Sequence, residues 1–389
     1  MTRRNIKLMY GIKFIATLNF VGAVLVPFFT NWGGLTFSQI MILQSWFMFW
    51  ILVLEIPTGT VADFWGRKIS ILLGLTVGAV GVLVYSSYPS FYVFLLGEFL
   101  WALSSALISG ADDSLVYDSL KENGQESMSK KVLARLESFK LGGLVVGVLI
   151  GSLIAHYWGL RATMLAMIFS FSLSALVALF LVEPKVKDEL ETKRYFDILK
   201  SGVKFFANNK AVKILTLDMV AIASIAYFMI WLGQPLLMRA GVDIKYFGLV
   251  SAAMLLGEIG ILNFYDRFEK LLGSKKRWLF GSAVVTGLFF ILAAINYLPL
   301  VIIAIVITAS FGLTRLPLFT SYINKYLPSA ERATILSTVA MIRQLVLVVF
   351  NPLIGLLVDR SLAIALLILG VAAIGFSFFS KVEEGMLLD

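Results

Sequence analysis

The chain has 389 residues, of which 59% are hydrophobic and only 15% are charged. Soluble domains carry about 25% charged residues, so this balance predicts a protein that lies in lipid. The net charge of +9 does not indicate nucleic-acid binding, because the basic residues fall in alternate loops. The absence of cysteine and a single histidine exclude disulfides and thiolate metal sites and argue against a metal centre.

Apolar runs long enough to cross a bilayer recur from end to end, since a spanning helix needs about 20 apolar residues. The first run follows Arg3 and Arg4 without a clear cleavage site, so we expect a retained span and not a signal peptide. The twelve predicted spans are 9–30, 38–62, 69–87, 90–117, 132–156, 161–182, 212–237, 244–265, 277–297, 299–325, 331–357 and 361–380.

These spans predict an all-α membrane protein with two six-helix bundles, residues 1–182 and 212–389, joined by a linker at 183–211. Within the linker, residues 195–206 carry apolar side chains at helical spacing with lysines between them, which favours an amphipathic helix on the membrane surface. An ordinary solvated linker is the alternative. We expect a monomer.

Lysine and arginine concentrate on one side of the predicted spans. Only Arg161, Arg239, Lys245 and Arg360 fall on the opposite side. Because cytoplasmic loops of membrane proteins are rich in Lys and Arg, this asymmetry places both termini and the linker in the cytoplasm. The chain is therefore predicted to be a multi-pass protein of the cytoplasmic (inner) membrane.

The two halves share a pattern of charges. A shift of 203 residues aligns Glu55 with Glu258, Asp63 with Asp266, Asp112 with Arg315, and Lys140 with Arg343. Few charges lie inside the spans, so several coincidences favour a duplicated architecture, as in many transporters.

One loop carries a specific motif between the second and third spans. It contains Gly59, Asp63, Gly66, Arg67 and Lys68 in the order G-x-x-x-D-x-x-G-R-K. Gly59 would permit close helix contact, Gly66 a tight turn, and the two charged residues an ion pair.

This motif, with its Glu55-Ile-Pro-Thr-Gly lead-in, resembles the corresponding loop of the major facilitator superfamily (MFS) and of its bacterial drug-efflux members. The resemblance implies two bundles that rock about a central site lined by spans one, four, seven and ten. It also implies a cytoplasmic gate in which Asp63 faces the start of span eleven near Arg332. An acid at the end of span four would receive Arg67, with Asp118 the first candidate and Asp113 the second.

Two drug–proton antiporter motifs are only partly kept. Glu98 stands where those proteins carry the arginine of L-x-x-x-R-x-x-x-G in span four. In span five, Gly143, Gly147 and Gly151 keep the glycines of G-x-x-x-G-P-x-x-G, but Val148 replaces the proline. The glycine spacing is also explained by close helix packing, so the direction of transport stays open.

Span four also carries a polar stripe. On a continuous helix Glu98, Ser105, Ser109 and Asp112 lie within an arc of about 60°, with Trp101 alongside and Asp112 about 21 Å deeper than Glu98. Such a stripe is predicted to face a water-filled cavity, and its carboxylates are candidates for proton coupling together with Glu55 and Glu258. The alternative is a structural salt bridge, for example between Asp112 and Arg315.

Further residues complete the predicted substrate cavity. Arg343 lies near mid-depth of span eleven and is expected to pair with Glu258 or to bind an anionic group of a substrate. Tyr227, Trp231 and Gln234 share a face of span seven suited to a flat or amphipathic molecule, although packing between helices explains them equally well. Lys140 and Arg315 are the other cations assigned to the cavity.

These features predict a secondary active transporter. No G-x-x-x-x-G-K-[ST] loop is present, so an ion gradient, most simply of protons, is the expected energy source, and no cofactor is expected. The first hypothesis is proton-coupled efflux of amphipathic small molecules, and the second is proton-coupled uptake or exchange of an organic anion. No H-E-x-x-H or G-x-S-x-G motif supports an intramembrane enzyme, and no sizeable extramembrane domain supports a receptor.

Overall fold

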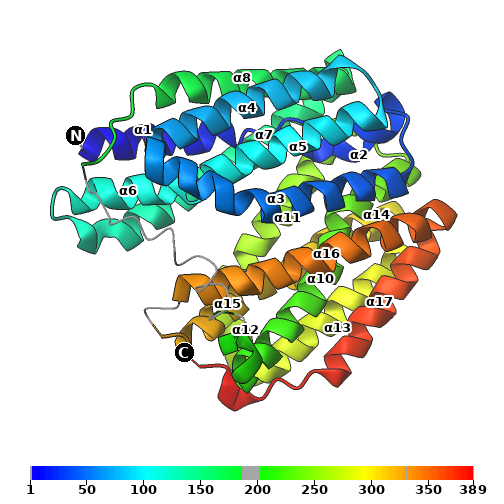
Figure 1. The fold of residues 1–389 in the computed structure, drawn as a ribbon. Coiled ribbons are helices and arrows are strands. Elements are labelled where there is room, and N and C mark those ends of the chain that lie inside the picture. Colours follow the sequence, from blue (N-terminus) through cyan, green and yellow to red (C-terminus); the bar gives the residue numbers. More distant parts are fainter. Residues whose placement is uncertain (1, 186–201, 203, 329–331, 389) are drawn as a thin grey trace. The chain divides into compact units, whose positions relative to one another are not determined.

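A computed structural model describes residues 2–185, 202, 204–328 and 332–388, and within them the chain is helical, with no β-strand (Figure 1). The chain divides into two compact units. Unit 1 comprises Met1–Thr192 with Ile244–Leu249, and unit 2 comprises Lys193–Asp243 with Val250–Asp389. The amphipathic helix predicted at 195–206 falls largely outside the described residues. The described stretch 204–208 is helical.

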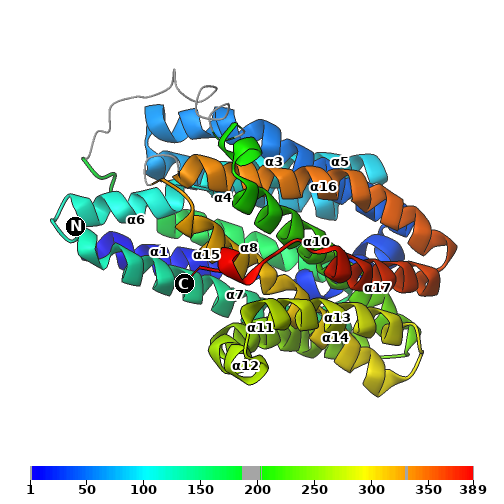
Figure 2. The ribbon, with the colours of Figure 1, turned by 90° about the horizontal axis from the view of Figure 1, so that it is seen from below.

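Unit 1 is a bundle of long helices. In it α4 packs against α5 and α8, α3 packs against α5, and α1 packs against α7 and α8 (Figures 1 and 2). Its elements are α1 (Thr2–Ala16), η1 (Gly22–Val24), α2 (Leu25–Pro27), η2 (Phe28–Trp32), α3 (Phe37–Trp65), α4 (Arg67–Ser87), α5 (Phe91–Ile108), α6 (Ala111–Lys121), η3 (Glu126–Met128), α7 (Ser129–Trp158), α8 (Leu160–Ala178) and η5 (Ile244–Tyr246).

Unit 2 is a second helical bundle. There α13 packs against α14 and α17, while α10 packs against α14, α15, α16 and α17. Its elements are α10 (Lys210–Arg239), most of α11 (Phe247–Asn263), α12 (Tyr265–Leu272), α13 (Lys275–Ala293), α14 (Leu298–Leu313), α15 (Arg315–Lys325), α16 (Arg332–Arg360), α17 (Leu362–Phe379) and η6 (Glu384–Met386).

The described residues contain 11 helical segments long and apolar enough to span a membrane, which correspond to predicted spans two to twelve. The segment predicted as the first span, 9–30, is not a single helix. There α1 ends at Ala16, and the chain resumes short helical turns only at Gly22. The hydroxyl of Thr17 donates to the carbonyl of Lys140 on α7 (3.0 Å), which ties the interruption to a neighbouring helix.

The glycines of α7 pack against this interruption. A Cβ atom added at Gly143, Gly147 or Gly151 would collide with backbone atoms of residues 14–20, whereas one added at Gly142 would meet only the Phe14 ring at 3.7 Å. The close packing that the spacing predicts is therefore present, and it holds α7 against the end of the first span.

Spans four and ten are each broken near the same relative position. In span four, α5 ends at Ile108 and Gly110 (φ +78°) turns the chain into α6. In span ten, α14 ends at Leu313, and Pro317 lacks the N–H that would continue the hydrogen-bond ladder to that residue. Both breaks place a charged residue, Asp112 or Arg315, in the first turn of the helix that follows.

The segment after α17 folds back onto unit 2. Val382 and Leu387 are buried in a hydrophobic cluster with Tyr265, Trp278 and Phe319. The ammonium of Lys275 donates to the carbonyl of Leu387 (3.0 Å). This tail is therefore an integral part of the end of unit 2.

Candidate functional site

The sequence motif at 59–68 forms the junction of α3 and α4. Most of it is helical, because α3 continues to Trp65, and only Gly66 (φ +97°) leaves the helix. The turn predicted at Gly66 is confirmed. Close helix contact at Gly59 is not found, since a Cβ there would meet no described atom within 4 Å, and Asp63 is exposed.

Arg67 and Asp118 form an ion pair that links the start of α4 to α6. This is the pair that the resemblance implied for the first candidate acid, Asp118. The carboxylate of Glu183, beyond α8, accepts hydrogen bonds from the backbone N–H groups of Arg67 (2.8 Å) and Lys68 (2.7 Å). Glu183 thus caps α4 at the end where the helix dipole favours a negative charge.

Unit 2 repeats this cap at the start of α13. The carboxylate of Glu384 accepts hydrogen bonds from the hydroxyl of Ser274 (2.6 Å) and from the N–H groups of Lys275 and Lys276 (2.9 Å each). Burial acts to raise the pKa of Glu384, but these hydrogen bonds outweigh it and hold the pKa below its ordinary value of 4.5. In each unit, the cap therefore connects the segment after the last span to the start of the third span.

Asp112 pairs with Lys13 of α1. Its other carboxylate oxygen accepts from the N–H of Asp113 (2.7 Å), at the start of α6. For Asp112 and Arg315, which the sequence suggested as a possible bridge, the structure shows a partner within each residue's own unit, Lys13 and Asp218.

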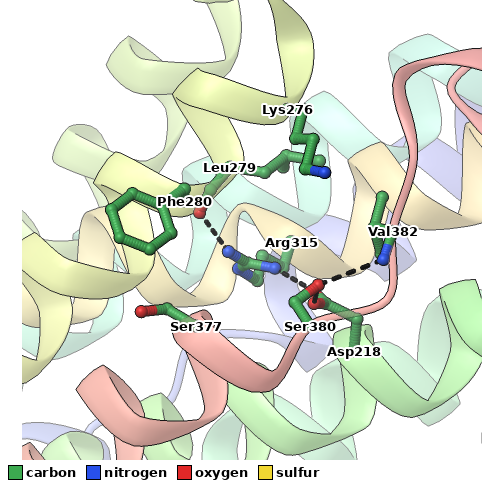
Figure 3. A pocket seen from close by; sticks show the side chains of 8 residues that line it. All are labelled: Asp218, Lys276, Leu279, Phe280, Arg315, Ser377, Ser380 and Val382. Atoms are coloured by element: carbon green, nitrogen blue, oxygen red, sulfur yellow. Dashed lines mark hydrogen bonds and ion pairs between the residues drawn. The ribbon is translucent and has the colours of Figure 1, made fainter.

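Arg315 pairs with Asp218 of α10 and also donates to the carbonyl of Leu279 (Figure 3). The hydroxyl of Ser380 donates to Asp218 (2.5 Å) from the other side. A pocket with an empty volume of about 330 Å³ lies beside this pair, lined by Asp218, Lys276, Leu279, Phe280, Arg315, Ser377, Ser380 and Val382. Arg315 was predicted to line the substrate cavity, but its contacts are those of a structural ion pair.

Glu98 of α5 is only 4% exposed and lies where this helix packs against α3 and α4. Its carboxylate accepts a hydrogen bond from the amide of Gln44 (3.0 Å) and interacts electrostatically with the phenol of Tyr85. No ion pair of Glu98 is present among the described residues. Its surroundings are aromatic, since the Tyr85 ring stacks on Phe94 with centroids 5.9 Å apart.

The continuous stripe predicted for span four is not present. Its 60° arc assumed one unbroken helix, whereas the break at Ser109 and Gly110 changes the direction of everything that follows. Glu98 therefore meets α3, and Asp112 meets α1. Ser109 is exposed, and Ser105 is half-buried. The ring of Trp101 lies edge-on to Tyr85, with centroids 5.5 Å apart.

The face predicted on span seven is buried, with Tyr227, Trp231 and Gln234 exposed by only 9%, 7% and 7%. Tyr227 lies edge-on to Trp231, with centroids 6.4 Å apart, and also interacts electrostatically with Arg343 of α16. Within unit 2, Arg343 makes no ion pair with a described residue. The predicted pairing with Glu258 is therefore not found.

The remaining predicted residues lie apart from these clusters. Lys140 pairs with Glu137 on the same face of α7 (2.9 Å). Glu55 is exposed on α3, Glu258 is half-buried on α11, and Asp113 is exposed on α6. Within unit 1, Glu98 meets α3 and Asp112 meets α1, while Glu55 is exposed, so these three carboxylates do not form one group.

Sequence reasoning missed Glu183, Glu384, Gln44 and Tyr85 altogether. The two glutamates could have been found from the sequence. Each follows the last span of its half, and a shift close to 203 residues relates their positions. Gln44 and Tyr85 carry no such signal, since only packing of α3 and α4 against α5 places them at Glu98.

The described helices are long and apolar enough to define a polytopic membrane protein. The sequence matches the family model of the Major Facilitator Superfamily over residues 9–351, and the chain belongs to that family. It is therefore a multi-pass secondary transporter of a small molecule and not an enzyme.

The relatives found by sequence are themselves uncharacterized. An MFS-type transporter of Bacillus subtilis (strain 168), YxaM, is 24% identical over 298 residues, which cover 74% of this chain and 72% of the relative. An uncharacterized transporter of Buchnera aphidicola (subsp. Acyrthosiphon pisum) is 27% identical over 40% of this chain and 38% of its own length.

Solved transporters share the fold. The nucleoside transporter NupG superposes with a TM-score of 0.81 at 13% identity, covering 97% of this chain and 99% of its own. A D-xylose–proton symporter gives a TM-score of 0.72 at 13% identity, covering 98% of each chain. At such identities the likeness establishes the MFS fold and nothing about the substrate.

Proposed function

We propose that this transporter exports amphipathic organic compounds from the cytoplasm in exchange for protons, and that Glu98 is the proton-binding residue. The observation that carries the proposal is the isolation of this carboxylate. It is buried in a span, its hydrogen-bond partner is the neutral amide of Gln44, and no cation among the described residues neutralises it.

An ionised carboxylate in such surroundings is costly, and carboxylates within membrane spans commonly mark proton pathways. Asp112 differs, because Lys13 neutralises its charge in the same unit. Protonation of Glu98 would change its hydrogen bonding to Gln44 and so the packing of α5 on α3. Both helices meet the motif that pairs Arg67 with Asp118, because α3 ends in it and α5 leads into α6.

The outward direction follows the first hypothesis drawn from the sequence, through the resemblance of the motif at 59–68 to drug-efflux transporters. The α7 glycines add nothing to it, because their packing against residues 14–20 accounts for them. The amphipathic substrate rests on the buried aromatic face of α10, formed by Tyr227 and Trp231. Aromatic side chains of this kind bind flat apolar molecules.

The test uses purified protein in inside-out vesicles with an acidic lumen and a panel of labelled amphipathic cations, anions and neutral compounds. We expect at least one compound to accumulate in the lumen and its accumulation to stop when the pH gradient is dissipated. Glu98→Gln should abolish this accumulation while leaving exchange of labelled for unlabelled compound intact. The control is Glu122→Gln, at an exposed acid beyond the end of α6.

Accumulation by Glu98→Gln equal to that of the wild type would refute the role of Glu98. Accumulation only with an alkaline lumen would refute export in exchange for protons and favour the second hypothesis, symport.

A further inference from the structure

One arginine of α16, Arg343, lies deep in its span and makes no ion pair with a described carboxylate of unit 2. Arg343 is the tenth residue of the span Thr334–Arg360, which places it about 14 Å from the span's first residue. It is half-buried, and its Nε atom donates no hydrogen bond to any described residue. A charged arginine at such a depth in a span is costly, so its retention needs a compensating partner.

The described carboxylates of unit 2 do not supply that partner. Asp218 is held by Arg315 and Ser380, and Glu258 makes no ion pair with Arg343. Asp359 lies four turns further along the same helix, too far for a contact. No described carboxylate of unit 2 pairs with Arg343. Its guanidinium is thus available to an anion from outside the protein.

Apolar aromatic surface lies directly beside this cation. Tyr227 of α10 is the residue that joins the two features, since it interacts electrostatically with Arg343 and lies edge-on to Trp231. The indole Nε1 of Trp231 is buried and donates no hydrogen bond to a described residue. Arg343 and Trp231, which Tyr227 connects, therefore each carry an N–H donor without a hydrogen-bond partner among the described residues.

From this juxtaposition we infer that unit 2 binds the anionic group of the substrate, and that the transported compounds are amphipathic organic anions. The carboxylate, sulfonate or phosphonate oxygens accept hydrogen bonds from Arg343, whose planar fork suits two oxygens of one group. The flat apolar body lies against Tyr227 and Trp231. This inference rests on the proposed function and narrows its substrate class.

Binding to purified protein in detergent, without any gradient, tests the inference separately from transport. The probes are three acids and their neutral amides: indole-3-acetate, salicylate and 4-hydroxyphenylacetate against indole-3-acetamide, salicylamide and 4-hydroxyphenylacetamide. Thermal shift and quenching of tryptophan fluorescence report binding. We expect at least one acid to bind at least tenfold more tightly than its amide.

Arg343→Gln should remove this preference, so that acid and amide bind alike, while Arg343→Lys should keep a weaker preference for the acid. The matched control is Arg360→Gln, which removes an exposed arginine from the end of the same helix and should keep the full preference. The Lys variant also guards against misfolding as the cause of a loss.

The inference is overturned if no acid of the panel binds the wild type more tightly than its amide. It is equally overturned if Arg343→Gln retains the wild-type preference. Proton-driven accumulation of an acid by the wild type, together with an acid preference that Arg343→Gln removes and Arg360→Gln keeps, would support both proposals. Intact acid binding without any gradient-driven transport would remove the proposed function and leave the binding site standing.

Discussion

Lys13 and Asp112 form an ion pair between α1 and α6, and unit 2 contains the same pair with its signs reversed. The shift of 203 residues that takes Asp112 to Arg315 takes Lys13 to within two residues of Asp218, which is the partner of Arg315. Each unit therefore fastens its first span to the second part of its fourth span by one acid and one base. Because the attraction depends only on opposite signs, each unit can make this connection with the acid and the base exchanged.

The reversed pair predicts the result of a charge exchange. Lys13→Asp alone and Asp112→Arg alone each leave buried like charges together, and removing one partner of a buried pair costs about 3–5 kcal/mol. The double variant Lys13→Asp with Asp112→Arg reproduces the arrangement of unit 2 and should recover most of the lost stability. Thermal unfolding in detergent measures this, and a double variant no more stable than the single variants would contradict the equivalence of the two bridges.

The α7 glycines predict a difference between two neighbouring positions. Gly151→Ala would place a methyl group on the backbone of Phe20, and overpacking of this kind costs about 1–3 kcal/mol. Gly142→Ala adds the same atom on the same helix with only an ordinary contact to Phe14, so it should be neutral or slightly stabilising. Melting temperatures of the two variants check the prediction. Equal losses would mean that helix propensity, and not the contact with residues 14–20, decides the effect.

Asp118→Asn should weaken the junction of α4 and α6. The substitution keeps the size of the side chain but leaves the guanidinium of Arg67 without its anion. We expect faster labelling of a cysteine introduced at Ser114 of α6, because that helix is then held less firmly. Glu122→Asn, at an exposed acid just beyond the same helix, is the control. Unchanged labelling in Asp118→Asn would show that the ion pair does not hold α6.

Glu384 predicts a dependence of stability on acid pH. Its pKa is lowered in the folded protein, so the carboxylate stabilises the fold above its unfolded pKa, and this contribution is lost as pH falls through the folded pKa. Glu384→Gln should therefore lower the melting temperature at pH 7 and make less difference near pH 3. The effect is modest, about 0.3–1 kcal/mol, as for other charges at helix N-termini on a protein surface.

Glu383→Gln is the matched control, because that exposed neighbour accepts none of these N–H groups. A destabilisation by Glu384→Gln that is the same at both pH values would show that the charge is not what caps α13.

Features that depend on residues close together in the chain could be predicted from the amino-acid sequence alone. Long apolar runs fix the spans, because every backbone group in lipid must be bonded within its helix. The turn at Gly66 and the pairing of Arg67 with Asp118 followed from the motif and its family resemblance. The shift of 203 residues marked Asp112 and Arg315 as equivalent.

Which side chains contact one another depends on the tertiary packing and could not be predicted from the sequence. Asp112 had several cations available in sequence, and packing of α1 against α6 selected Lys13, while the break at Gly110 turned Glu98 and Asp112 toward different helices. Gln44 lies beside Glu98, and Glu384 lies on α13, through contacts between segments far apart in the chain. Hydrophobicity and helical period act over a few residues, whereas the partner of a buried charge depends on the path of the whole chain.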